Sequence, residues 1–180
     1  AGSGVFADLF AGTGVVADHF CRLGWAVLLN DNLLCHHIPH RVFFASRREG
    51  MDPQRVQEHL VAMNAVPGQP GYICRQFSDT YFTRQNAARL DAMREYLDSP
   101  ATSGCTASER DWLLTSLLYA ADKAANTCGQ YDAFLKHIGS APHGDDGTHR
   151  VDANVYKPIR LAVPQVVFDR PAQAYCEHGH

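Results

Sequence analysis

The sequence predicts an α/β fold, in which a partial parallel β-sheet is joined to a largely helical region. Two short apolar runs, at residues 5–9 and 25–29, have the length and composition of buried strands. Between them lie a glycine turn and a stretch, residues 15–23, whose apolar side chains recur at helical spacing. The side chains expected on the buried face of this helix are Val15, Val16, Phe20 and Leu23. A strand, a glycine turn, a helix and a second strand within about thirty residues form a βαβ unit, whose strands run parallel.

Most of the remaining chain has helical patterns. The ranges expected to be helical are 33–44, 51–63, 86–97, 109–126 and 130–138. Pro39 is expected to kink the first of these helices or to mark a restart, because proline disrupts helical hydrogen bonding. On the second helix, Val56, Leu60 and Met63 share one face, which we expect to be buried. Ser108 is expected to be the N-cap of the long fourth helix.

The last part of the chain has few strand signals. Residues 159–168 are apolar and extended, but Pro164 restricts them to an edge strand or to a segment outside the sheet. The string at 176–180 has no pattern of a closing element. The expected sheet is therefore smaller than the roughly four to six strands that such sheets usually hold. We interpret the chain as a piece of a longer protein.

The composition indicates a globular protein and counts mildly against DNA binding by this chain alone. The chain has 180 residues, of which 46% are hydrophobic and 19% charged, which suits a compact domain with a sizeable core. Lys and Arg number 16 against 19 Asp and Glu, for a formal net charge of −3. Domains that bind DNA usually carry a basic excess, because they neutralise phosphates. A local basic face remains compatible with this balance.

The sequence has no pattern of a membrane span or a secretory signal. No apolar run approaches the roughly 18 residues that a membrane helix needs. The first residues lack a basic stretch followed by an apolar one. The six cysteines include no Cys-x-x-Cys pair, so we expect reduced thiols and a cytoplasmic location.

The most informative string follows the first strand: Asp8-Leu9-Phe10-Ala11-Gly12-Thr13-Gly14. Glycines between a parallel strand and a helix let the backbone approach a ligand closely, and the helix N-terminus offers N–H groups to it. Asp31 and Asn32 close the second strand, where a carboxylate can accept both hydroxyls of a ribose. These features predict a site for an adenosine-bearing cofactor at the carboxyl ends of the strands. The alternative is that the glycines only form a strand-to-helix turn.

The spacing Gly12-x-Gly14-x-x-Ala17 also fits a nicotinamide or flavin site, so an NAD(P)-binding oxidoreductase domain is an alternative. Asp8 argues against it, because a carboxylate beside the turn would repel a pyrophosphate. The same carboxylate is well placed for the ammonium group of a methionine moiety. The residues therefore favour S-adenosylmethionine.

His36-His37-x-x-His40 raises the possibility of a zinc site. Zinc needs three or four converging ligands, and this string has no nearby pair of cysteines and is interrupted by Pro39. We expect no metal site here.

The first motif resembles that of adenine-specific DNA methyltransferases of the Dam-like group, which have an acidic residue followed by Phe-x-Gly-x-Gly. Strings further along the chain are similar to the central region of that group. They are Tyr81-Phe82-Thr83-x-x-Asn86-Ala87, the stretch 116–127, and Asn126-Thr127-Cys128-Gly129-Gln130-Tyr131 with Phe134-Leu135-Lys136. The similar region spans roughly residues 5–168.

The resemblance implies a Rossmann-like methyltransferase core with a largely helical insertion. Residues 1–45 would then form the S-adenosylmethionine-binding core, 46–150 the insertion and a possible DNA-recognition region, and 151–180 a segment returning toward the core. The cofactor site would comprise Asp8, Leu9, Phe10, Ala11, Gly12, Thr13, Gly14, Asp31 and Asn32. The DNA-binding candidates are Arg75, Arg84, Lys123, Asn126, Tyr131 and Lys136.

The reaction implied by the resemblance is methyl transfer to the exocyclic amine of adenine in double-stranded DNA, with the base flipped out of the helix. The group holds that amine with an Asp-Pro-Pro-Tyr segment. This sequence has none, because its one Asp-Pro pair, Asp52-Pro53, continues differently. We therefore expect no catalytic residue in this chain. A non-catalytic module that binds DNA or a partner protein is a further alternative.

Overall fold

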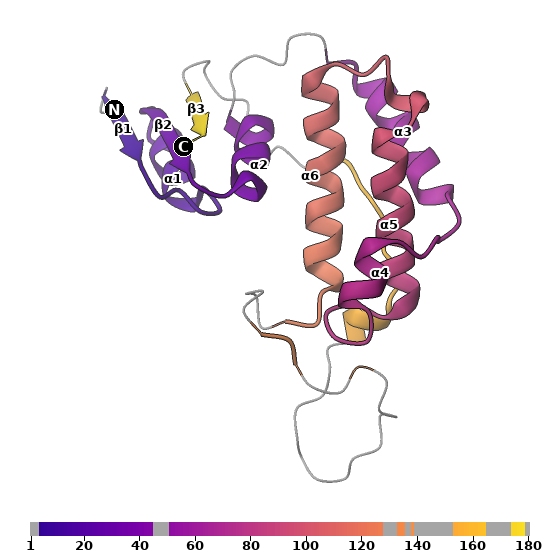
Figure 1. Cartoon of the computed structure of the whole chain (residues 1–180). Coiled ribbons are helices and arrows are strands. Elements are labelled where there is room, and N and C mark those ends of the chain that lie inside the picture. Colours follow the sequence, from indigo (N-terminus) through magenta and orange to yellow (C-terminus); the bar gives the residue numbers. More distant parts are fainter. Residues whose placement is uncertain are drawn as a thin grey trace. The chain divides into compact units, whose positions relative to one another are not determined.

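The computed structural model of the protein describes residues 4–44, 51–127, 133–135, 138, 153–164 and 174–178 (Figure 1). The chain forms two compact units. Unit 1 comprises Ala1–Val56, Cys105–Thr115 and Val163–His180, and unit 2 comprises Gln57–Gly104 and Ser116–Ala162. In the described part of the chain, no helix combines the length and the apolar character needed to cross a membrane.

Unit 1 contains a three-stranded parallel sheet in the order β1-β2-β3. The strands are β1 (Val5–Asp8), β2 (Ala26–Asp31) and β3 (Ala174–His178), and α1 (Val15–Arg22) connects the first two. The predicted βαβ unit is thus confirmed, because β1 and β2 pair in parallel with Val5 opposite Ala26 and Asp8 opposite Leu29. The carboxyl ends of both strands consequently lie at the same edge of the sheet.

The expectation that the chain has no closing element was wrong. Residues 174–178 form β3, which pairs in parallel with β2 from Val27 to Asp31. The segment is short, and its apolar and polar residues do not alternate as in a typical strand. Its position in the sheet therefore depends on the unpaired backbone N–H and C=O groups at the edge of β2. Such an edge can pair with a distant segment of almost any composition.

The predicted buried face of α1 was wrong for three of its four residues. Val15, Val16 and Leu23 are 70%, 49% and 50% exposed. Phe20 does pack inward, as predicted, and its ring stacks on Phe6 of β1 with centroids 3.9 Å apart, but beside it the helix packs through Ala17, which is fully buried. The small side chain of Ala17 lets the helix approach the sheet closely, and this turns the β-branched residues outward.

The second helix, α2 (Leu34–Phe44), continues through Pro39, so of the two predicted alternatives, a kink or a restart, the restart is wrong. The helix packs against β2 and β3 and buries Val42 and Phe44. On its exposed side, the Arg41 guanidinium pairs with the Asp111 carboxylate. Burial raises the pKa of Asp111 despite the favourable charge of Arg41.

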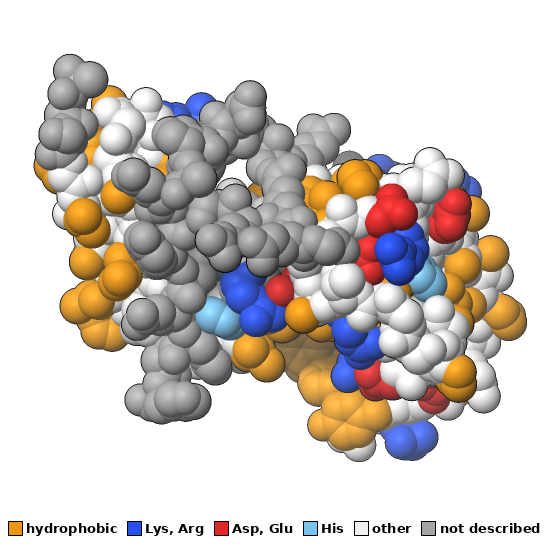
Figure 2. Space-filling view, turned by 90° about the horizontal axis from the view of Figure 1, so that it is seen from above, with side chains coloured by type: hydrophobic (Ala, Val, Ile, Leu, Met, Phe, Trp, Pro, Cys, Tyr) orange, Lys and Arg blue, Asp and Glu red, His pale blue; other side chains and the backbone are white. Residues whose placement is uncertain are grey.

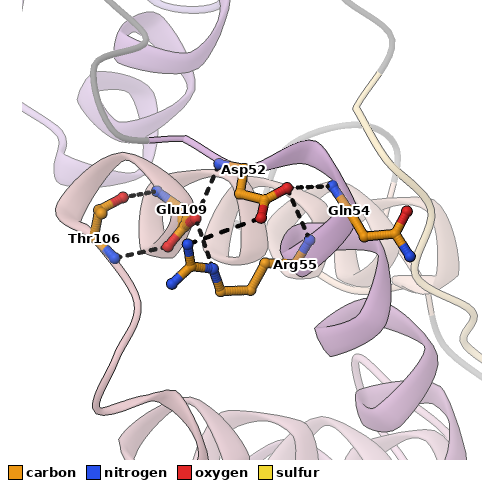
Figure 3. Close-up of polar contacts among 5 residues, drawn as sticks. All are labelled: Asp52, Gln54, Arg55, Thr106 and Glu109. Atoms are coloured by element: carbon orange, nitrogen blue, oxygen red, sulfur yellow. Dashed lines mark hydrogen bonds and ion pairs between the residues drawn. The ribbon is translucent and has the colours of Figure 1, made fainter.

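The long helix α6 (Ala107–Ala124) begins with a capping box rather than at the predicted cap, Ser108. The Thr106 hydroxyl accepts from the Glu109 N–H (3.2 Å), and the Glu109 carboxylate accepts from the Thr106 N–H (2.8 Å; Figure 3). This reciprocal pair satisfies two backbone donors that the helix start would otherwise leave without a partner. The prediction failed because Ser108 already lies inside the first turn.

The Glu109 carboxylate also anchors the start of α3 (Pro53–Ala65), as Figure 3 shows. It accepts from the Asp52 N–H (3.0 Å) and lies 3.2 Å from the Arg55 guanidinium, while the Asp52 side chain caps α3 by accepting from the Gln54 N–H (2.9 Å). Burial would raise the pKa of Glu109, but these N–H donors and Arg55 outweigh it and lower that pKa. Glu109 is 0% exposed, so its role is structural: it connects the start of α6 to the start of α3.

Unit 2 is helical, and it includes most of α3 and the second half of α6 together with α4 (Tyr72–Phe77) and α5 (Arg84–Asp98). Two short 3₁₀ helices, η1 (Pro100–Thr102) and η2 (Ala153–Tyr156), complete its described elements. The predicted inward face of α3 is confirmed, since Val56, Leu60 and Met63 are at most 2% exposed. The sequence patterns missed α4, which has only six residues. The helix predicted at 130–138 is wrong at residues 133–135, where Phe134 instead bridges Thr127 in an antiparallel pair.

Residues 159–164 lie outside the sheet, and two asparagines explain why. Asn64 of α3 donates to the Leu161 carbonyl (2.9 Å) and accepts from the Leu161 N–H (2.8 Å). Asn86 of α5 donates to the carbonyls of Val155 and Lys157 and accepts from the Ile159 N–H (3.2 Å). Because side chains satisfy this backbone, the segment needs no neighbouring strand.

Candidate cofactor site

The turn after β1 is fixed by backbone hydrogen bonds at the carboxyl edge of the sheet. The Ala11 N–H donates to the Asn30 carbonyl (3.0 Å), and the Gly14 N–H donates to the Ala11 carbonyl (2.7 Å). Gly12 and Gly14 have φ of 52° and 79°, in the left-handed region that favours glycine. The two glycines are therefore required by the path of the backbone.

The carboxylate of Asp31, at the end of β2, is bonded directly to this turn. Its Oδ2 accepts from the Gly12 N–H (2.7 Å), and its Oδ1 accepts from the Leu33 N–H (2.8 Å) and from His36 Nδ1 (3.1 Å). Burial would raise the pKa of Asp31, but the donors from Leu33, Gly12 and His36 outweigh it and lower that pKa. Asp31 is 8% exposed and ionised at neutral pH. The glycine turn and the acid thus share one site.

The two glycines of the turn differ in what surrounds them. A Cβ added to Gly14 would lie 2.8 Å from the Phe44 ring, so this glycine allows close packing of α2. A Cβ added to Gly12 would meet no heavy atom within 4 Å. Gly12 therefore presents open space beside its hydrogen bond to Asp31, which is where a ligand could approach the backbone.

The remaining predicted cofactor residues are sequence neighbours of Gly12 or of Asp31. Phe10 is 91% exposed and Leu9 is 55% exposed, while Thr13 and Asn32 are also exposed and Asp8 is partly exposed. Sequence reasoning missed Asn30, whose amide donates to the Leu9 carbonyl (3.1 Å). Its position immediately before the acid, at the end of a predicted strand, was the signal that could have revealed it.

Two histidines of α2 also contact the site and were not predicted to do so. His36 bonds Asp31, and His40 Nε2 lies 2.8 Å from the Gly12 carbonyl. His40 is 2% exposed, and burial lowers its pKa, despite the opposing influence of the Gly12 carbonyl and of nearby Asp31. No group of three or more His, Cys, Asp or Glu side chains able to hold a metal occurs within the residues that the structure describes. In the same residues, Cys21, Cys35, Cys74 and Cys105 form no disulfide bond.

The described DNA-binding candidates, Arg75, Arg84, Lys123 and Asn126, belong to unit 2. Arg75 and Lys123 are exposed, and Arg84 has a side chain that is 73% exposed and pairs with Asp79 (2.8 Å). Tyr131 and Lys136 lie outside the described residues. On the face drawn in Figure 2, blue and red side chains are interspersed among the coloured atoms.

The Asn126 side chain is buried and makes hydrogen bonds within the fold. It is 1% exposed, its amide donates to the Thr80 carbonyl (2.9 Å) and to the Leu135 carbonyl, and its backbone N–H donates to the Tyr81 carbonyl (2.8 Å). These contacts tie the turn before α5 to the segment after α6. A DNA contact by this side chain stays a prediction.

Comparisons with known proteins agree with the resemblance inferred from the motifs. The sequence profile of the D12 class N6 adenine-specific DNA methyltransferases matches residues 2–145. Type II methyltransferase M.NlaIII of Neisseria lactamica is 30% identical over 141 residues, which is 74% of this chain and 41% of that protein. Modification methylase StsI of Streptococcus sanguinis is 31% identical over 145 residues, which is 74% of this chain and 22% of that protein.

A third relative, modification methylase LlaI of Lactococcus lactis subsp. lactis, is 31% identical over 143 residues, covering 73% of this chain and 23% of that protein. The chain thus spans less than half the length of these curated relatives. No solved structure matches the chain. Because the profile covers most of its residues, the chain belongs to the D12 class N6 adenine-specific DNA methyltransferase family.

Proposed function

We propose that this chain binds S-adenosylmethionine at the carboxyl edge of the sheet, through residues 8–14 with Asp31 and Asn32. The observation that carries the proposal is the open space at Gly12 beside its 2.7 Å hydrogen bond to Asp31. Asp31 is ionised; its Oδ2 accepts from the Gly12 N–H of the turn, and its Oδ1 accepts from the Leu33 N–H and from His36.

The surroundings of the turn favour a methyl donor over a nicotinamide cofactor. Phe10, Leu33 and Leu34 are apolar side chains exposed by 52% or more, and they flank the turn and the acid in the sequence. Such side chains suit an adenine ring and a thioether chain better than a pyrophosphate. The Asp8 carboxylate suits an ammonium group. Bound S-adenosylmethionine would supply a methyl group on a positively charged sulfur, ready for transfer.

Calorimetry with three ligands tests the site. We expect S-adenosylmethionine and S-adenosylhomocysteine to bind and NAD to bind weakly or not at all. Asp31→Ala should weaken both productive ligands at least tenfold, because it removes the acceptor and frees the glycine turn. Tighter binding of NAD, or no heat with any of the three ligands, would contradict the proposal.

We further propose that the protein transfers the methyl group to the exocyclic amine of adenine in double-stranded DNA. The family to which the chain belongs, and the names of its relatives as type II methyltransferases and modification methylases, support this reaction. Because this chain has no Asp-Pro-Pro-Tyr segment, the test is expression of the gene at its full length in a host that lacks N6-methyladenine, followed by nucleoside mass spectrometry of the DNA. N6-methyl-2′-deoxyadenosine is expected, whereas methylated cytosine alone would contradict the assignment of the base.

Unit 2 carries a row of aromatic rings that supports a role in DNA contact. The rings of Tyr72, Phe77, Tyr81 and Phe134 follow one another edge to face, with centroid distances of 6.1, 5.9 and 5.4 Å. The two ends are exposed, Tyr72 by 63% and Phe134 by 41%. Exposed aromatic rings stack on bases, and neighbouring arginines contact phosphates.

We propose that Arg75, on α4 with Tyr72 and Phe77, contacts the DNA backbone, with Arg84 at the start of α5 and Lys123 on α6 as further candidates. Arg75→Glu should weaken DNA binding at low salt and reduce its salt dependence. Arg22→Glu is the matched control, because Arg22 is an exposed arginine of α1 paired with Asp18. Equal losses for the two variants would indicate a general charge effect and remove Arg75 from the proposed contacts.

A further inference from the structure

The histidines of α2 form an arrangement that the zinc interpretation does not explain. His36 and His40 are four residues apart, so they lie on the same face of the helix, with ring centroids 6.5 Å apart. Each ring bonds a different part of the candidate cofactor site. His36 reaches Asp31, and His40 reaches Gly12.

Both polar atoms of the Gly12 backbone are held by side chains. Its N–H donates to Asp31 Oδ2 (2.7 Å), and its carbonyl accepts from His40 Nε2 (2.8 Å). Asp31 in turn accepts from His36 Nδ1 (3.1 Å), which closes a circuit from α2 through the acid and the glycine and back to α2. The orientation of the Gly12 backbone is therefore set by α2 as well as by the turn.

The bonding partners define the protonation of each ring. A carbonyl oxygen only accepts, so His40 carries a proton on Nε2, and an ionised carboxylate only accepts, so His36 carries one on Nδ1. Two histidines that each have to donate with a defined nitrogen cannot also use that nitrogen to bind a metal.

We propose that His36 and His40 are positioning residues of the methyl-donor site, which hold the Asp31 carboxylate and the Gly12 peptide in the geometry that binds the ligand. The proposal rests on the function proposed above. The His40 ring also packs against the Phe44 ring, with centroids 5.9 Å apart. Each histidine acts through the Asp31 carboxylate or the Gly12 peptide, so we assign neither of them a catalytic role.

Paired substitutions separate the hydrogen bond from the shape of the ring. His40→Phe keeps a planar ring but removes the donor, whereas His40→Gln retains an N–H near the position of Nε2. For His36, Ala removes the donor and Asn keeps one near Nδ1. His19→Phe is the control, because His19 is an exposed histidine of α1 outside the circuit. Because His36 is partly exposed, its variants keep the test available if His40→Phe does not fold.

The readouts are the affinity for S-adenosylhomocysteine by calorimetry, the unfolding temperature without ligand, and the ¹⁵N shifts of the two imidazoles. We expect His40→Phe to weaken binding about fivefold to tenfold and His36→Ala about threefold, as for lost hydrogen bonds. His40→Gln, His36→Asn and His19→Phe should stay within about twofold of the unsubstituted chain. The imidazole shifts should give the two tautomers described above.

Different failures have different meanings. If the unsubstituted chain binds the ligand and His40→Phe and His36→Ala bind it equally well, the positioning role is overturned and the proposed function stands. If the unsubstituted chain binds no ligand, the proposed function fails and the positioning role fails with it. If His40 carries its proton on Nδ1 alone, the circuit does not exist, whatever the affinity.

Discussion

Two buried aspartates, one in each unit, make similar hydrogen bonds and differ in what lies around them. Asp31 accepts from the N–H groups of Gly12 and Leu33 and from His36. Asp91 of α5 accepts from the N–H groups of Gly71, Ile73 and Cys74, at 2.7, 2.8 and 2.7 Å. Both side chains are at most 8% exposed, and both bind the N–H of a glycine.

The space beside the glycine distinguishes the two. A Cβ on Gly71 would lie 2.8 Å from Asp91 Cγ, so the acid fills that space and acts as a cap for α4. A Cβ on Gly12 would meet nothing within 4 Å. A buried acid that holds backbone N–H groups is therefore a structural feature by default, and it becomes a candidate ligand site only where the backbone beside it remains open.

The largest expected effect is on stability, at the capping acid. Asp91→Ala leaves three N–H donors without their acceptor and should lower the free energy of unfolding by about 3 to 5 kcal/mol. Urea denaturation measures this. Asp79→Asn is the control: Asp79 has an exposed ion pair and a φ of 63° that asparagine tolerates, so its loss should stay below about 1 kcal/mol. A similar decrease in the free energy of unfolding for both variants would show that Asp91 contributes no more than an exposed acid.

The next effect is on ligand affinity, at the acid of the candidate site. Asp31→Asn keeps one acceptor oxygen but loses the charge, and it should weaken S-adenosylhomocysteine at least tenfold. In a chain that still folds, a conservative substitution at Asp91 should leave this affinity within about threefold, because the cap lies in the other unit. Calorimetry on Asp31→Asn and Asp91→Asn gives the comparison. Equal losses of affinity would mean that Asp31, like Asp91, only supports the fold.

Gly12 and Gly14 show the same difference between a glycine beside open space and a glycine beside a packed side chain. Gly14→Ala forces a methyl group against Phe44 and should cost about 2 kcal/mol or more of stability. Gly12→Ala meets no atom and should cost only about 1 kcal/mol, the strain of a left-handed alanine. Its methyl group would nevertheless enter the open space and reduce ligand affinity. If Gly12→Ala binds the ligand normally, the open space is not the ligand site.

The smallest expected effect is a pH dependence of stability that comes from His40. Because its pKa is lowered in the folded chain, the unfolded chain binds the proton first as the pH falls below about 6.5. Stability from His40 is thus present above that pH and is lost on acidification. The charged and titratable groups that act on His40 are Asp31, His36 and Asp8.

Thermal unfolding between pH 7.5 and 5.5 tests this dependence, with His40→Gln as the comparison. The substituted chain should show a flatter profile over this range, since Asp31 and Glu109, whose pKa values are also lowered, lose their stabilising charge only near pH 4 and below. Parallel profiles would assign the dependence to another group.

The parts of the structure that could be predicted from the sequence were those with local signals. The apolar runs, the glycines and the acid at the end of the second run lie within about thirty residues, where periodicity and turn chemistry are informative. The outward position of Val15 and Val16 was not predictable in this way, because helical spacing allows more than one buried face. The small side chain of Ala17 selected the other one.

The sequence by itself determined a βαβ unit with a glycine turn and an acid at one edge of the sheet, because these features depend on neighbouring residues and on parallel pairing. The tertiary structure decided the rest. It paired Ala174–His178 with a strand more than a hundred residues earlier, used Asn64 and Asn86 to hold an extended segment, and brought His40 to the carbonyl of Gly12. Hydrogen bonds between distant segments leave no period in the chain, so only the folded arrangement selects their partners.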